Sequence, residues 1–135
     1  LACADVRNDD VREQLMELSG DIADDFRPIR NEVAGREVAS PVSPVLITKI
    51  LMGTLGCVPA YDRFFEEGAR HLGLEKKSYN KDSLRELADF YEEHNDRLEE
   101  ARRGMQTDDL IYPQMKLLDM GLWQVGFERD AAGAK

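Results

Sequence analysis

The amino-acid sequence predicts an all-α protein, a single compact domain of about five helices packed like a bundle. Long stretches carry apolar residues at steps of three and four, which is the spacing of one face of an α-helix. No stretch alternates apolar and polar residues as a strand does, and no Asn-Gly or Asp-Gly hairpin turn is present. We expect the helices near residues 44–56 and 113–126 to be central, because apolar residues cover most of their sides.

Size and composition indicate one helical domain over residues 1–135. The chain has 135 residues, of which 42% are hydrophobic and 33% are charged, so a core can form without disulfides or metals. The two cysteines, Cys3 and Cys57, do not make a disulfide framework. The ends of the domain, residues 1–7 and 130–135, are predicted to be frayed.

The chain is acidic, with a formal net charge of −9. Because phosphate backbones repel this charge, nucleic acid is a disfavoured partner. The longest apolar stretch, residues 45–58, contains Lys49 and is too short to span a bilayer, so no membrane segment is expected. By default we expect a cytoplasmic protein, although Leu1-Ala2-Cys3 also fits the end of a lipoprotein cleavage site.

The first helix is expected from Val11 to Val33. Its apolar stripe consists of Val11, Leu15, Leu18, Ile22, Phe26, Ile29 and Val33. Asn8 is a suitable N-cap and Gly35 a suitable end. Pro28 is expected to kink or split the helix near residues 24–27. The acidic face is either a solvated surface or a contact for a basic partner; it comprises Glu13, Glu17, Asp21, Asp24 and Asp25.

Two further helices follow in the middle of the chain. Ser43 and Pro44 fit the N-cap and first position of a helix that is apolar on nearly every side and ends near Gly56. A third helix is expected over residues 61–72, with Gly73 as its stop.

The last third of the chain predicts two more helices. One runs from residue 81 to 104 behind the cap Asn80, with a heptad seam of Leu84, Leu87, Tyr91, His94, Leu98, Ala101 and Met105. The other begins at Pro113. Its apolar residues, including Met120 and Trp123, are expected in the core, and an aromatic pocket wall is the alternative.

Lys49 is the most informative candidate for a functional side chain, because it lies in an otherwise apolar helix. Burying its ammonium group without a partner is unfavourable, so the side chain either reaches out to solvent or meets a carboxylate, for which Asp62 and Asp119 are the candidates. One interpretation is a structural ion pair that fixes how the helices cross. The other is a polar site between helices, with Lys49, Asp62, Arg63 and Asp119 as ligand-binding candidates.

Gly53 and Gly56 are the second unusual feature of this helix, because a glycine inside a helix is unfavourable by about 1 kcal/mol relative to alanine. Close approach of another helix explains them, and so does a ligand lying against the backbone. Their spacing matches neither a P-loop nor a dinucleotide-binding fingerprint.

The same region is similar to one part of the helix-hairpin-helix DNA glycosylases. The similarity rests on Lys49-Ile50-Leu51, on the Pro-x-x-Asp of residues 59–62 and on the Asp-x-x-Leu-Trp of residues 119–123. These residues cover a small part of the chain. The Gly-x-Gly hairpin and the catalytic aspartate of that family are not found, and the net charge is wrong for a duplex binder. No family is therefore assigned.

No other residues assemble into a catalytic motif, and no cofactor or metal site is predicted. Cys57 has no base linked to it by a local motif, which favours an inert buried thiol. Glu67 and His71 share a helical face, but two ligands do not make a metal site. His94 is expected to be a hydrogen-bonded core residue.

The sequence therefore leaves open whether the chain is an enzyme. The leading hypothesis is a protein–protein interaction or structural module, with a protein partner or self-association into a homodimer. The alternative is a small-ligand-binding protein or enzyme with a polar site around Lys49, Asp62 and Asp119. A nucleic-acid-associated protein is a third hypothesis, which only the glycosylase similarity supports.

Overall fold

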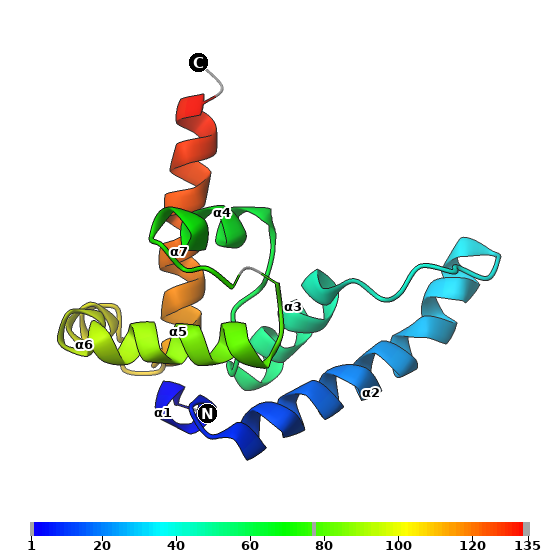
Figure 1. The fold of residues 1–135 in the computed structure, drawn as a ribbon, viewed down its shortest axis with the longest axis horizontal. Coiled ribbons are helices and arrows are strands. Elements are labelled where there is room, and N and C mark those ends of the chain that lie inside the picture. Colours follow the sequence, from blue (N-terminus) through cyan, green and yellow to red (C-terminus); the bar gives the residue numbers. More distant parts are fainter. Residues whose placement is uncertain (1, 77, 134–135) are drawn as a thin grey trace.

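The computed structural model describes residues 2–76 and 78–133, and this part of the chain is helical with no strand (Figure 1). The seven helices within it are α1 (Cys3–Val6), α2 (Asp9–Ala34), α3 (Pro44–Leu55), α4 (Arg63–His71), α5 (Lys81–Glu93), α6 (Asn95–Gly104) and α7 (Gln114–Gly133). The all-α fold class is confirmed. The count exceeds the expected five because α1 was not predicted and because the expected helix over residues 81–104 is divided into α5 and α6.

The N-terminal segment packs on the core, although it was expected to be frayed. Cys3 and Val6 of α1 are buried, and the backbone N–H of Cys3 donates to Oε1 of Gln114 at 2.7 Å. The buried guanidinium of Arg12 donates to the carbonyls of Val6 and Arg7 at 2.8 and 2.7 Å. Arg12 therefore ties α1 to α2, a link between side chain and backbone that apolar periodicity does not reveal.

Helix α2 begins and ends where the sequence predicts. The side chain of Asn8 accepts from the N–H of Asp10, and Gly35 closes the helix with φ of 63°. The helix runs through Pro28 without a break, so of the two outcomes predicted near residues 24–27, a kink or a split, the split is wrong. Proline removes one backbone donor, and here both residue 28 and residue 24 are exposed, so solvent reaches the carbonyl that loses its partner.

Helix α3 buries one face only. Its cap, Ser43, accepts from the N–H of Val45, and Ile47, Thr48 and Leu51 face the core. A Cβ atom on Gly53 would meet nothing within 4 Å, so close approach of a helix does not explain this glycine.

Gly56 has a clear structural role at the end of α3. Its φ of 60° is left-handed, and a Cβ atom there would lie 2.5 Å from Cγ of Pro113. A side chain at this position would therefore strain the backbone and clash with the residue that precedes α7.

The most extensive helix contact joins α4 and α7, which lie side by side in Figure 1. A Cβ atom on Gly68 would be 1.8 Å from the carbonyl oxygen of Leu122, and one on Gly126 would be 1.9 Å from that of Phe64. The two backbones therefore meet at glycines, and α7 is held against α4 more closely than any larger residue allows.

The expected helix over residues 81–104 breaks at His94, where φ is −110° and ψ is 18°. The N-terminal part of the predicted seam is buried at Leu84, Leu87 and Tyr91, whereas α6 buries no residue. The continuous heptad seam is therefore wrong, and so is the expectation of a core histidine. The ring of His94 is exposed and packs edge-on against Phe90, with ring centroids 4.5 Å apart.

Candidate functional sites

A concavity of about 410 Å³ lies between α3, the start of α4 and α7. It is lined by Lys49, Met52, Ala60, Asp62, Lys116, Asp119, Met120, Trp123 and Gln124. Three of the four ligand-binding candidates, Lys49, Asp62 and Asp119, thus meet at one place, and we call it the lysine pocket.

Lys49 is paired with Asp62 at the rim of the lysine pocket. Nζ of Lys49 is 3.8 Å from Oδ2 of Asp62, and the lysine side chain is 53% exposed. The other oxygen of Asp62, Oδ1, accepts from the N–H of Phe65 at 3.1 Å and so caps α4. The carboxylate is therefore held by the backbone, while the ammonium group reaches solvent and is not sealed between helices.

Asp119 lies deeper and has a different partner. Its side chain is 8% exposed; Oδ1 accepts from the N–H of Ala60 at 2.9 Å and Oδ2 accepts from Nζ of Lys116 at 2.8 Å. Asp119 therefore pairs with Lys116 and not with Lys49. Lys116 was missed in the sequence, although a lysine three residues before an aspartate in one helix is a recognisable signal.

Arg63 does not line the lysine pocket. Its guanidinium forms an ion pair with Asp130 of α7 at 3.1 Å and lies 4.6 Å from the ring centroid of Phe64. It thus borders a half-exposed aromatic cluster of Phe64, Trp123 and Phe127, in which the last two rings are stacked 5.1 Å apart. Trp123 therefore has two roles: it contacts Phe64 of α4 in this cluster, and it forms part of the wall of the lysine pocket.

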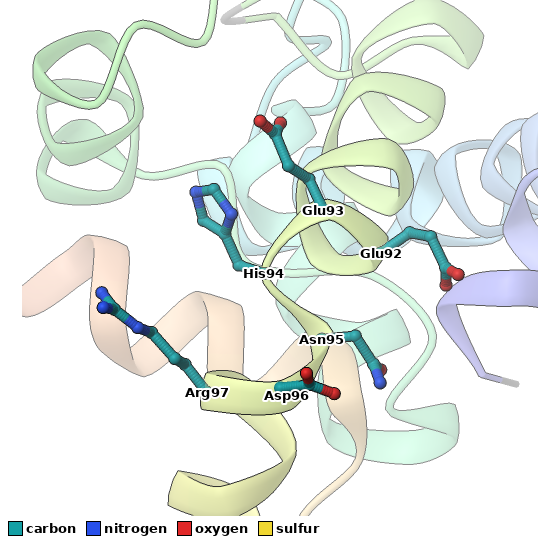
Figure 2. Close-up of a pocket in the computed structure, with 6 residues that line it drawn as sticks. All are labelled: Glu92, Glu93, His94, Asn95, Asp96 and Arg97. Carbon is teal, nitrogen blue, oxygen red and sulfur yellow. The ribbon is translucent and has the colours of Figure 1, made fainter.

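A wider depression of about 610 Å³ lies where α5 meets α6 (Figure 2). It is lined by Glu92, Glu93, His94, Asn95, Asp96 and Arg97. Figure 2 shows these side chains spreading in different directions, with Glu92 and Arg97 on opposite sides of the chain. Because a binding site needs converging groups, this depression is only the surface of the helix break.

The remaining reactive side chains do not assemble into a site. Cys57 is fully buried, and burial raises the pKa of its thiol, which favours the inert thiol form. Glu67 pairs with Arg70, and Nε2 of His71 lies 3.5 Å from Arg129. Within residues 2–76 and 78–133 no three potential metal ligands come together.

The second candidate site is the outer half of α2, residues 20–34, in which no residue is buried. Figure 1 shows this half reaching away from the other helices. The apolar stripe continues along it: Ile22 and Phe26 are partly buried, whereas Ile29 is 53% and Val33 is 85% exposed. The core covers the stripe near the start of α2 but leaves its end bare.

The loop after α2 is fastened to the outer half by polar contacts. Arg30 donates to the carbonyls of Val38 and Ser40, and Oδ1 of Asn31 accepts from the N–H of Val38 at 3.0 Å. These bonds hold the returning chain beside the helix and leave the apolar end of the stripe uncovered.

No protein-family model, no curated protein and no solved structure matches the chain. No helix in the part of the chain that the structure describes has the length and apolar character needed to cross a bilayer.

Proposed function

We propose that this domain is a protein–protein interaction module that binds a basic amphipathic helix along the outer half of α2. The observation that carries the proposal is the bare end of the apolar stripe, Ile29 and Val33, on a helix that projects from the body of the domain. Exposed apolar surface with a regular pattern is typical of interaction sites.

The spacing of the stripe favours a helix as the partner. Ile22, Phe26, Ile29 and Val33 follow steps of four, three and four residues. Side chains at these steps form a seam into which the knobs of a second helix fit. An extended peptide is less suitable, because α2 offers no free backbone groups for strand pairing.

Charge beside the stripe favours a basic partner. Asp21, Asp25 and Glu32 stand at i, i+4 and i+11, which places them on one side of a helix with about 3.6 residues per turn. Asp24, on another side, is paired with Arg27 at 3.2 Å, whereas no ion pair within the described residues engages this row of three carboxylates. Lysine or arginine residues along the edge of a partner helix would complement the row.

A second copy of the chain fits this surface less well. In an antiparallel two-fold pair, each side of one helix faces the same side of the other, so the two carboxylate rows would meet and repel. In a parallel pair the row would face Arg30, whose guanidinium is already bound to two loop carbonyls. Self-association is therefore an outcome that the experiment must separate from binding of a basic helix.

The test uses a fluorescein-labelled helical peptide with leucine at the seam positions and lysine elsewhere. We expect it to bind the wild-type chain in fluorescence anisotropy and to lose most of its affinity for the triple variant Asp21→Lys, Asp25→Lys, Glu32→Lys. The matched control changes the exposed acids of another surface, Glu92→Lys, Glu93→Lys, Asp96→Lys, and has the same net charge. Ile29→Ser combined with Val33→Ser removes the apolar part of the contact.

The proposal is supported if the α2 variants weaken binding and the control triple variant does not. Equal losses in both triple variants would mean that the peptide senses net charge only and would overturn it. Sedimentation equilibrium of the free protein is the companion measurement. A dimer that dissociates in Ile29→Ser with Val33→Ser would show that the stripe binds a second copy and would replace the proposed partner.

A further inference from the structure

We propose that the lysine pocket binds a small organic anion with a flat apolar body, such as an aromatic carboxylate. This site lies between α3, α4 and α7 and shares no residue with the outer half of α2. The proposal is therefore independent of the interaction function, and each can fail without the other.

The first argument is the number of hydrogen-bond donors in the pocket. An ammonium group carries three N–H donors. The Nζ atom of Lys49 is 3.8 Å from Asp62, beyond hydrogen-bonding distance, and no described residue provides it with a closer carboxylate. Lys116 uses one donor on Asp119, and its other acceptor is the sulfur of Met52 at 3.6 Å, which is a weak acceptor. Both lysines therefore have donors to spare.

Three of the four carboxylate oxygens in the pocket accept hydrogen bonds, and the fourth, on Asp62, faces Lys49. Both oxygens of Asp119 accept hydrogen bonds, from the N–H of Ala60 and from Lys116. One oxygen of Asp62 accepts from the N–H of Phe65, and the other faces Lys49. A ligand that brings acceptors and negative charge thus finds unused partners, whereas a cationic ligand has to compete with the lysines for the carboxylates.

The remaining wall selects an apolar body. Met52, Met120 and the half-buried Trp123 line the same concavity. Thioether and indole groups make favourable contacts with the flat face or edge of an aromatic ring. A volume of about 410 Å³ is within the range of small-molecule sites.

The groups that shape the pocket are fixed before any ligand arrives. Asp119 is held by the backbone at Ala60, and Asp62 is held as the N-cap of α4. Trp123 is stacked on Phe127 and meets Phe64 edge-on. Because these groups lose little conformational entropy on binding, little of the interaction free energy of a small ligand is offset by ordering the pocket.

Trp123 provides a direct reporter, because it is the single tryptophan of the chain. We would titrate the ¹⁵N-labelled protein with benzoate and follow the one indole N–H cross-peak by NMR. Benzyl alcohol keeps the ring without the charge, and benzamidine reverses the charge. The variant Lys49→Gln removes the more exposed ammonium group, and Lys76→Gln, an exposed lysine outside the pocket, is the matched control.

Benzoate is expected to shift the indole peak saturably, with a dissociation constant of about millimolar order for so small a ligand. Lys49→Gln should weaken this binding about tenfold through loss of a charged hydrogen bond, and Lys76→Gln should leave it unchanged. An indole peak that does not move overturns the proposal. So does equal binding of benzamidine or benzyl alcohol, or a Lys49→Gln variant that binds as well as wild type. Circular dichroism checks that both variants are folded.

Discussion

The crossing of α4 with α7 is a tightly packed region of the molecule, and the outer half of α2 is a loosely packed one. At the crossing, Gly68 and Gly126 let the two backbones touch, so that even a Cβ atom would overlap a carbonyl oxygen. In the outer half of α2 no residue is buried, and Val33 at its end is 85% exposed. Helix α7 packs against α4 of the same chain, whereas the outer half of α2 exposes its apolar stripe to solvent.

This difference teaches that apolar periodicity identifies a face but not what covers it. The stripe of α2 is regular from Leu15 to Val33, yet the core covers only its first half. Contact at the crossing is set by small residues, which carry little weight in a hydrophobic pattern. A single substitution should therefore change the free energy of unfolding much more at the crossing than in the outer half of α2.

The largest effect is expected at Gly126. Gly126→Ala places a methyl group 1.9 Å from the carbonyl oxygen of Phe64, so α7 must move away from α4. We expect the free energy of unfolding to fall by about 3 kcal/mol or more, as for severe overpacking of a core. Urea or thermal unfolding measures it. Gly121 is an exposed position of the same helix where a Cβ atom would meet nothing within 4 Å. Gly121→Ala should therefore raise the free energy of unfolding by about 0.5–1 kcal/mol. Similar values for the two variants would show that the helices are not in backbone contact.

The helix boundaries were largely predictable because capping is local. Asn8, Ser43 and Asn80 cap helices as predicted, and Gly35 and Gly56 end them. The glycine contact was not predictable, because Gly68 and Gly126 are far apart in the sequence and a glycine inside a helix looks only like a weak point. The break at His94 was missed because the heptad spacing continues through it, although no residue of α6 is buried.

The candidate site was predicted in part. The sequence singled out Lys49 and Asp62 because an isolated charge in an apolar helix needs a partner, and the two are paired at 3.8 Å. It assigned Asp119 to the right region but not to its partner, Lys116, which lies three residues away on the same helix. Arg63 was wrongly grouped with them, because neighbours in sequence at the start of a helix point to different sides.

The second largest effect is expected at Glu99, which joins α6 to the rest of the body. Its carboxylate accepts from the hydroxyl of Tyr91 at 2.7 Å, from Nε2 of Gln114 at 2.9 Å and from the guanidinium of Arg102. These donors, Arg102 above all, lower the pKa of Glu99 from 4.5 to about 2. Glu99→Gln should reduce the free energy of unfolding by about 2 kcal/mol at neutral pH, and Glu100→Gln, an exposed neighbour, should not.

The pH dependence of this contribution follows from the direction of the pKa shift. A carboxylate whose folded-state pKa is lowered stabilises the fold fully above its unfolded value, here 4.5, and loses that effect as pH falls toward about 2. Wild type should therefore lose stability relative to Glu99→Gln between these two values. Parallel stability curves for the two proteins over that interval would contradict the network, and with it the view that α6 is fixed to the body.

A smaller and local effect is expected at Arg30, in the outer half of α2. Arg30→Met removes the bonds to the carbonyls of Val38 and Ser40 that fasten the returning loop. The amide of Val38 donates to Asn31, and its hydrogen-exchange rate should rise by a factor equivalent to about 1 kcal/mol in the free energy of local opening. The free energy of global unfolding should hardly change. Arg36→Met, an exposed arginine at the same turn, serves as the control. A loss of global stability in Arg30→Met would mean that this half unfolds together with the body.

The smallest effect is expected at Val33. Because its side chain is 85% exposed, Val33→Ser should change the free energy of unfolding by no more than about 0.5 kcal/mol. Leu15 lies on the same stripe but is only 4% exposed, so Leu15→Ser should lower the free energy of unfolding by about 3 kcal/mol. Denaturant unfolding of the two variants compares both halves of one helix directly. If Val33→Ser costs as much as Leu15→Ser, the stripe is covered in solution, and the outer half of α2 is not a free surface. If it is neutral, any loss of peptide binding in the variant reports on the surface itself and not on a damaged fold.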